Sequence, residues 1–328
     1  MIGASAGGIS AVSSVLEKLP ESFPAAVLIV IHISPYSPGN LSAVIGRRSK
    51  LRVHDAVSGS TIEHGHVYVA PPDLHLLIRE KKIVLARGPR ENRSRPAIDA
   101  LFRSAAVEYG PRVIAAVLTG YLDDGTSGLR AVKRCGGVAV VQDPATAEVG
   151  EMPRAAIRSV DVDHKVDLEA LPALLERLTN ESVDDRFRAP TDLVIERGIA
   201  EGRSDHMADN ETIGDPSELG CPECGGPLWR IDDGEFRRYR CHVGHAYSPI
   251  ALLASQSESI EEALWVALRT LEERTRMLTM LSREGTGRMA RDFADRALES
   301  ERHAQQIRAQ LHRLSPLREG DQETRSSA

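Results

Sequence analysis

Short runs of aliphatic and β-branched residues, separated by amphipathic stretches, constrain the fold of this chain more than any other feature. Residues 27–31, 113–118 and 138–141 are apolar at consecutive positions, and the first of these runs ends in His32. Such runs are typical of strands buried between two layers of helices. Helix-like segments at 9–19 and 97–109 alternate with them. This alternation predicts an α/β fold with a doubly wound, mostly parallel sheet and helices on both faces.

Charge and hydropathy exclude several classes of function. The formal net charge is −6, which argues against a protein that binds nucleic acid by covering phosphates with Lys and Arg. No stretch approaches the 18 consecutive apolar residues of a membrane span, and the N-terminus lacks the pattern of a signal peptide. We therefore expect a cytoplasmic protein without membrane insertion or nucleic-acid binding.

Changes in composition divide the chain into five predicted segments. They are an α/β domain at 1–178 with an antiparallel excursion at 51–90, a polar linker with one short helix at 179–220, a Cys/His module at 221–247, a helical hairpin at 248–316 and a disordered tail at 317–328. The apolar stripe of the hairpin suits self-packing and docking or homo-oligomerisation equally well.

A glycine-rich turn near the N-terminus is the first candidate site. The residues Gly3-Ala4-Ser5-Ala6-Gly7-Gly8 fit the G-x-S-x-G pattern that exposes a nucleophilic serine between a strand and a helix. Such a turn is equally typical of a phosphate-binding loop. Taken alone, it does not distinguish catalysis from binding.

Two further residues make a catalytic reading of Ser5 stronger. His32 ends the strand that follows the Ser5 turn, so both residues are expected at carboxyl ends of neighbouring parallel strands. Asp124 follows the strand at 113–118 and supplies a carboxylate to orient the imidazole, whereas Asp123 fits a surface turn. The chain order Ser, His, Asp differs from that of α/β-hydrolases, so membership of that class is not expected.

These residues belong to a series of motifs that runs through the first 178 residues. The motifs are 2–8, 31–32, 68–71, 92–99, 118–120, 124–125, 142–144 and 152–153. In this order they resemble the catalytic domain of the chemotaxis protein-glutamate methylesterases, the CheB family. The resemblance implies hydrolysis of glutamyl methyl esters on methylated chemoreceptor-like proteins, together with deamidation of glutamines, without a catalytic cofactor.

The resemblance also implies roles for individual residues. Ser5 is then the nucleophile, His32 the general base and acid, and Asp124 the orienting carboxylate. Backbone N–H groups near Ala6 and Tyr121 would form the oxyanion hole, although the family often has methionine where Tyr121 stands.

Two features of the N-terminal part depart from the family pattern. We expect no receiver domain in front of the esterase, so that the enzyme is constitutive or regulated by a partner. Only Met1 and Ile2 precede the turn, whereas a strand needs about five residues to pair fully. We therefore expect either a native start upstream or a frayed first strand.

Three of the four cysteines cluster in the second half of the chain. Cys221 and Cys224 form a C-x₂-C knuckle, and Cys241 is followed by His242 and His245. This spacing predicts a zinc-ribbon-like module with a structural Zn²⁺ on Cys221, Cys224, Cys241 and His245, with His242 as the competing fourth ligand. A metal-free turn is less expected, because a segment this short has little core.

The alternative to an enzyme is a catalytically silent regulatory or binding module of a chemotaxis-like signalling system. The set of Ser5, His32 and Asp124 favours the enzyme, because a binding module does not need all three. A nucleotide-binding regulator ranks last, because the glycine-rich turn has no P-loop lysine.

Overall fold

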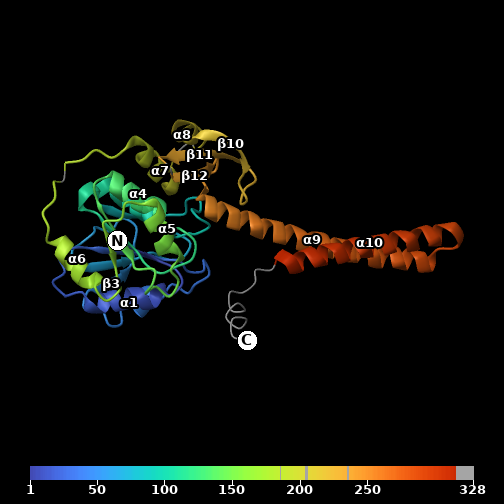
Figure 1. Ribbon diagram of the computed structural model, residues 1–328, viewed down its shortest axis with the longest axis horizontal. Coiled ribbons are helices and arrows are strands. Elements are labelled where there is room, and N and C mark those ends of the chain that lie inside the picture. Colours follow the sequence, from blue (N-terminus) through green and yellow to red (C-terminus); the bar gives the residue numbers. More distant parts are fainter. Residues whose placement is uncertain (185, 204–205, 235, 315–328) are drawn as a thin grey trace, which may run out of the picture. The chain divides into compact units, whose positions relative to one another are not determined.

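The computed structural model describes residues 1–184, 186–203, 206–234 and 236–314, without the side chains of 206–208 and 314. Contacts between residues divide the chain into two units, Met1–Leu252 and Leu253–Ala328 (Figure 1). The predicted disordered tail at 317–328 lies outside the described residues. The first unit contains all of the candidate site residues.

A seven-stranded sheet with the order β3-β4-β2-β1-β7-β8-β9 forms the centre of the first unit. Every pair of neighbouring strands in it is parallel, so the predicted α/β fold is confirmed. The strands are β1 (Ile2–Ala4), β2 (Val27–Ile31), β3 (Arg52–Asp55), β4 (His66–Val69), β7 (Ile114–Val117), β8 (Val138–Gln142) and β9 (His164–Val166).

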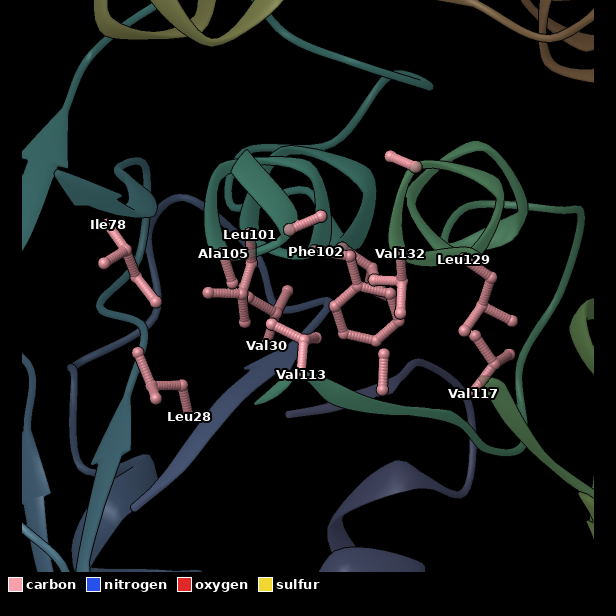
Figure 2. Close-up of a cluster of buried hydrophobic side chains, with 14 of the residues drawn as sticks. Leu28, Val30, Ile78, Leu101, Phe102, Ala105, Val113, Val117, Leu129 and Val132 are labelled. Atoms are coloured by element: carbon pink, nitrogen blue, oxygen red, sulfur yellow. The ribbon is translucent and has the colours of Figure 1, made fainter. Parts of the chain in front are cut away.

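Helices cover both faces of this sheet. They are α1 (Gly8–Lys18), α2 (Leu41–Ile45), α3 (Ile98–Tyr109), the 3₁₀ turn η1 (Gly110–Arg112), α4 (Thr126–Arg134), α5 (Glu151–Ser159) and α6 (Leu171–Thr179). Strand β2 is apolar throughout because both of its faces are covered. Leu28 and Val30 pack in the core under α3, α4 and α5, and Val27, Ile29 and Ile31 pack in the core under α1, α2 and α6. Figure 2 shows α3 and α4 facing the first of these cores.

The first strand is short but firmly held. β1 pairs with β2 on one side and with β7 on the other, and all three of its residues are buried. The amino group of Met1 donates a hydrogen bond to the carbonyl of Ile114 at 2.6 Å. The frayed strand that the sequence led us to expect is therefore not found, because pairing on two sides compensates for its length.

The predicted antiparallel excursion at 51–90 is much shorter than expected. Only β5 (His75–Arg79) and β6 (Lys82–Ala86) form an antiparallel hairpin, whereas β3 and β4 belong to the parallel sheet. Strands this short give no periodicity from which the direction of pairing can be derived.

The segment predicted as a polar linker at 179–220 is more structured than expected. It contains α7 (Thr191–Glu201), α8 (His206–Ile213) and strand β10 (Asp215–Gly220). Leu193, Ile199 and Ala200 of α7 are buried. The sequence did not indicate this packing, because a glutamate such as Glu196 is normally exposed. Here Glu196 is buried, and arginines that lie far away in the sequence balance its charge.

The C-terminal module begins with β10 and is an antiparallel four-stranded sheet of order β10-β11-β12-β13. Its other strands are β11 (Pro227–Asp233), β12 (Phe236–Cys241) and β13 (Ala246–Tyr247). Below, "the module" means residues 215–248 without residue 235, which the structure does not describe.

Two long helices, α9 (Pro249–Glu284) and α10 (Gly287–Leu314), form the predicted hairpin. Within the second unit they pack through Leu268, Ala304 and Leu311. In the described part of the chain, no helix combines the length and the apolar character needed to cross a bilayer.

Candidate active site and metal centre

Ser5 lies in the turn between β1 and α1, at the carboxyl end of the parallel sheet. Its amide donates to the carbonyl of Thr119 at 2.9 Å, and its carbonyl accepts from the amide of Gly8 at 2.8 Å. Gly7 has φ 73°, and a side chain there would come within 2.6 Å of Glu148. The glycine thus permits a sharp turn that leaves Ser5 half-buried in front of the first turn of α1.

His32 follows β2, and the register of the sheet brings it beside Ser5. Ala4 pairs with Ile31 in the parallel ladder, and the His32 amide donates to the Ala4 carbonyl at 3.1 Å. The Nε2 atom of His32 lies 2.7 Å from Oδ2 of Asp124. Among the described residues no hydrogen bond joins the Ser5 hydroxyl to His32, so Nδ1 is the ring nitrogen left for that contact.

Asp124 is buried, and several donors surround its carboxylate. Oδ2 accepts the amide of Ile98 at 2.7 Å, and Oδ1 accepts the amides of Asp99 at 3.1 Å and Gly125 at 3.0 Å. The first two amides belong to the N-terminus of α3, whose dipole favours a negative charge. Burial alone would raise the pKa of Asp124, but the hydrogen bonds from His32 and Ile98 hold it below its ordinary value.

Two residues that support Asp124 carry no role in the sequence-based prediction. Asn92 donates through Nδ2 to Asp124 at 3.2 Å and to Asp99 at 2.8 Å. Asp99 also accepts the amides of Gly125 and Gly128, and burial together with the Asp124 charge raises its pKa well above the ordinary value. Both residues lie in the motif 92–99, and its charged and amide residues were the one indication in the sequence that this segment contributes to the site.

The two backbone groups expected to bind an oxyanion lie in the turns beside Ser5. In the described part of the chain, the amides of Ala6 and Tyr121 take part in no hydrogen bond, whereas the carbonyl of Ala6 accepts the Thr119 hydroxyl at 2.8 Å. The same hydroxyl accepts the amide of Val149 at 2.8 Å. Thr119 therefore fixes the turn that leaves the Ala6 amide available, and the Tyr121 side chain is exposed.

The structure gathers Cys221, Cys224, Cys241 and His245, with their ligand atoms all within 4.8 Å of one another. Sγ of Cys221 and Sγ of Cys241 lie 3.7 Å and 3.5 Å from Nδ1 of His245, and Sγ of Cys224 lies 3.7 Å from Sγ of Cys241. In a zinc tetrahedron with bonds of about 2.3 Å to sulfur and about 2.0 Å to nitrogen, two sulfurs lie about 3.8 Å apart, and a sulfur and a nitrogen lie about 3.5 Å apart. The four side chains therefore fit a metal ion of this kind.

The surroundings of His245 also fit a metal ligand. Its Nε2 lies 3.3 Å from a carboxylate oxygen of Glu223, the type of contact that fixes the tautomer of a ligating histidine. Tyr247 donates to the other Glu223 oxygen at 3.0 Å and lies 3.5 Å from Sγ of Cys221. His242, the competing ligand, is not part of the cluster.

Comparison with known proteins connects the first part of the chain to a single family. A sequence model of the CheB methylesterase family matches residues 1–175. A relative from Leptospira interrogans, which carries the provisional name protein-glutamate methylesterase/protein-glutamine glutaminase, is 41% identical over 187 residues that cover 57% of this chain and 97% of the relative. A protein-glutamate methylesterase/protein-glutamine glutaminase 2 from Anaeromyxobacter dehalogenans is 38% identical over 55% of this chain and 52% of its own length.

The fold is also similar to that of a solved structure. The crystal structure of the Thermotoga maritima CheB methylesterase catalytic domain matches with a TM-score of 0.52 and 33% sequence identity. The match covers 54% of this chain and 96% of that domain. The match to the family model ends at residue 175, before the module begins.

Proposed function

This chain belongs to the CheB methylesterase family, and on that premise we propose that it hydrolyses glutamyl methyl esters of a methylated chemoreceptor-like protein. The observation that carries the proposal is the His32–Asp124 pair at 2.7 Å, at the edge of the sheet where Ser5 follows β1. Deamidation of glutamines by the same site follows chemically, because an amide and an ester pass through the same acyl-enzyme.

In the first half-reaction, Ser5 attacks the ester carbonyl while His32 accepts the hydroxyl proton at Nδ1. The Asp124 carboxylate accepts a hydrogen bond from the Nε2–H of the same ring, stays ionised and stabilises the imidazolium that forms. The free amides of Ala6 and Tyr121 donate to the oxyanion of the tetrahedral intermediate. His32 then returns its proton to the leaving oxygen, and methanol departs, or ammonia when the substrate is a glutamine.

In the second half-reaction, water replaces the alcohol. His32 takes a proton from the water as it attacks the acyl-enzyme, and returns that proton to the Ser5 oxygen when the ester bond breaks. The glutamyl carboxylate is released, and the site regains its first state.

For the module we propose a structural role with Zn²⁺ on the three cysteines and His245. The tetrahedral distances and the Glu223 contact support the choice of metal. Four protein ligands leave no open position for a substrate, so the ion would stabilise the module and take no part in hydrolysis.

The experiment that tests the esterase is methanol release from methylated chemoreceptor membranes. Wild-type protein is expected to release methanol, and the Ser5→Ala variant is expected to lose several orders of magnitude in rate. Ser13→Ala, on the solvent side of α1, serves as the matched control. Equal rates for wild type and Ser5→Ala would reject the proposed mechanism, and absence of release by both would favour a silent regulatory module.

A further inference from the structure

Two residues connect the module with the candidate catalytic centre. Ser248 is the last residue of the module, and it contacts Asn92 of the esterase domain, which in turn contacts Asp124. We propose that both are positioning residues, through which the C-terminal module holds the Asp124 carboxylate in the orientation that His32 requires. The inference rests on the proposed role of Asp124 and concerns only residues of the first unit.

Ser248, the last residue before α9, makes its contacts with the esterase domain. Its amide donates to Oδ1 of Asn92 at 2.9 Å, and its hydroxyl donates to Oδ1 of Asp123 at 2.7 Å. The same hydroxyl accepts the amide of Ala251 at 3.0 Å and so caps the helix. One buried residue thus joins the start of α9 to the residue that precedes Asp124.

The amide contact of Ser248 helps to fix which way the Asn92 side chain points. Only the carbonyl oxygen of an asparagine can accept a hydrogen bond from Ser248, so the NH₂ group must face the opposite direction. There it donates to Asp124 and Asp99. The two carboxylates favour the same orientation, because an Asn92 oxygen turned toward them would place acceptor against acceptor, so the Asn92 side chain is held at both ends.

The backbone around Asn92 is also held by the module. The Asn92 amide donates to the carbonyl of Ala246 at 2.8 Å, and the Ala246 amide donates to the carbonyl of Arg90 at 3.1 Å. Asn92 has φ 47°, a left-handed conformation that asparagine tolerates better than most residues. Ala246 of β13 and Glu91 of the loop that carries Asn92 therefore form a short parallel β-bridge.

The same short strand leads directly to the Cys/His cluster. His245 precedes Ala246, and Tyr247, whose hydroxyl lies beside Cys221, separates Ala246 from Ser248. A guanidinium nitrogen of the buried Arg240, also in the module, lies 3.3 Å from a carboxylate oxygen of the buried Glu91, which precedes Asn92. The position of Asn92 is thus fixed by module residues.

Asn92→Asp in the full chain provides the sharpest test. The substitution keeps the size of the side chain and an acceptor for Ser248, but replaces the donor that faces Asp124 with an oxygen. Two readouts are compared with wild type: kcat and KM for methanol release, and the far-downfield ¹H NMR resonance of the His32–Asp124 hydrogen bond. We expect kcat to fall about 10- to 100-fold with KM within about twofold, and the resonance to shift or broaden.

A second variant keeps the proposal testable if Asn92→Asp does not fold. Ser248→Ala keeps the amide that donates to Asn92 and removes the hydroxyl that donates to Asp123 and caps α9. We expect it to lower kcat about 3- to 10-fold and to perturb the same resonance. Ser255→Ala, a buried serine further along α9, is the matched control and should leave both readouts unchanged.

The outcomes separate this inference from the proposed function. Unchanged kcat and an unchanged resonance in folded Asn92→Asp and Ser248→Ala would overturn the positioning role while leaving the esterase intact. If wild-type protein releases no methanol but the resonance is present and changes in both variants, the positioning role stands and the proposed substrate does not.

Discussion

Arg238 of β12 donates two hydrogen bonds, of 2.6 Å and 2.8 Å, to the carboxylate of Glu196 on α7, and both side chains are buried. Glu196 also receives Arg240 at 2.8 Å and lies 3.5 Å from Arg103. Arg103 pairs in turn with Glu91. Opposite charges thus meet in the interior, where removal of one partner leaves the others without compensation.

Glu196→Ala is expected to destabilise the protein by about 3–5 kcal/mol, because three arginines lose a buried counter-charge. Urea unfolding followed by circular dichroism measures the change. Glu169→Ala, which breaks an exposed pair with Lys18, is the control and should change little. A loss for Glu196→Ala no greater than that of the control would contradict the importance of the network.

Asp123 is expected to make stability depend on pH. Burial, with the nearby Asp124 charge, raises its pKa to about 6 from the model-compound value of 3.8, despite the hydrogen bond from Ser248. The folded state binds this proton more tightly than the unfolded state, so the contribution to stability is full below about pH 4 and is lost as the pH rises through 6.

Replacement of Asp123 with Asn should therefore have little effect on stability at pH 4 and should stabilise the protein by up to about 3 kcal/mol at pH 8. Unfolding by urea at both pH values measures the difference from wild type. Asp161→Asn, at an exposed position, is the control for the loss of a surface charge. A difference between wild type and Asp123→Asn that does not grow with pH would show that the pKa of Asp123 is not raised.

Asp124→Asn should separate the orienting carboxylate from its neighbour in sequence. The amide cannot stabilise the imidazolium of His32 and favours the wrong tautomer, so kcat is expected to fall about 10⁴-fold. Asp123→Asn is expected to lose less than about tenfold, because Asp123 contacts Ser248 and not His32. The rates of methanol release by the two variants are compared. A larger loss for Asp123→Asn than for Asp124→Asn would show that Asp123 is the carboxylate that orients His32.

Removal of the metal should weaken the module. We expect wild-type protein to hold about one zinc ion per chain, and the Cys224→Ser variant to hold less and to unfold at a lower temperature. Mass spectrometry for metal content and calorimetry for Tm measure the two quantities. Cys135→Ser, at a buried cysteine outside the cluster, is the control. Zinc content unaffected by Cys224→Ser would remove Cys224 from the ligand set.

Local patterns in the sequence were sufficient for part of this architecture. Strand β2 is apolar throughout because both of its faces are covered, and this alone indicates a central strand of a parallel sheet. Cys221 and Cys224 likewise predict a metal site by their spacing. Pairing partners of short edge strands such as β3 are not encoded in so local a pattern, and the predicted direction for that strand was wrong.

Contacts between distant residues explain what the sequence could not reveal. Asn92 and Ser248 are separated by 156 positions, and no periodicity or motif relates them. Helix α7 reads as part of a polar linker because Glu196 looks like a solvent-exposed residue. The approach of Arg238 and Arg240, 42 and 44 positions away, makes its burial favourable.

The buried pairs among Glu91, Glu196 and the three arginines have a consequence for how the first unit unfolds. Glu91 and Arg103 come from the esterase domain, and Arg238 and Arg240 from the module. If the module opened alone, Glu91 and Glu196 would keep Arg103 as their one counter-charge in this network, and Arg238 and Arg240 would lose their carboxylate partners. The family match ends at residue 175, but the unit that unfolds cooperatively should extend further. We expect residues 1–252 to unfold in one transition.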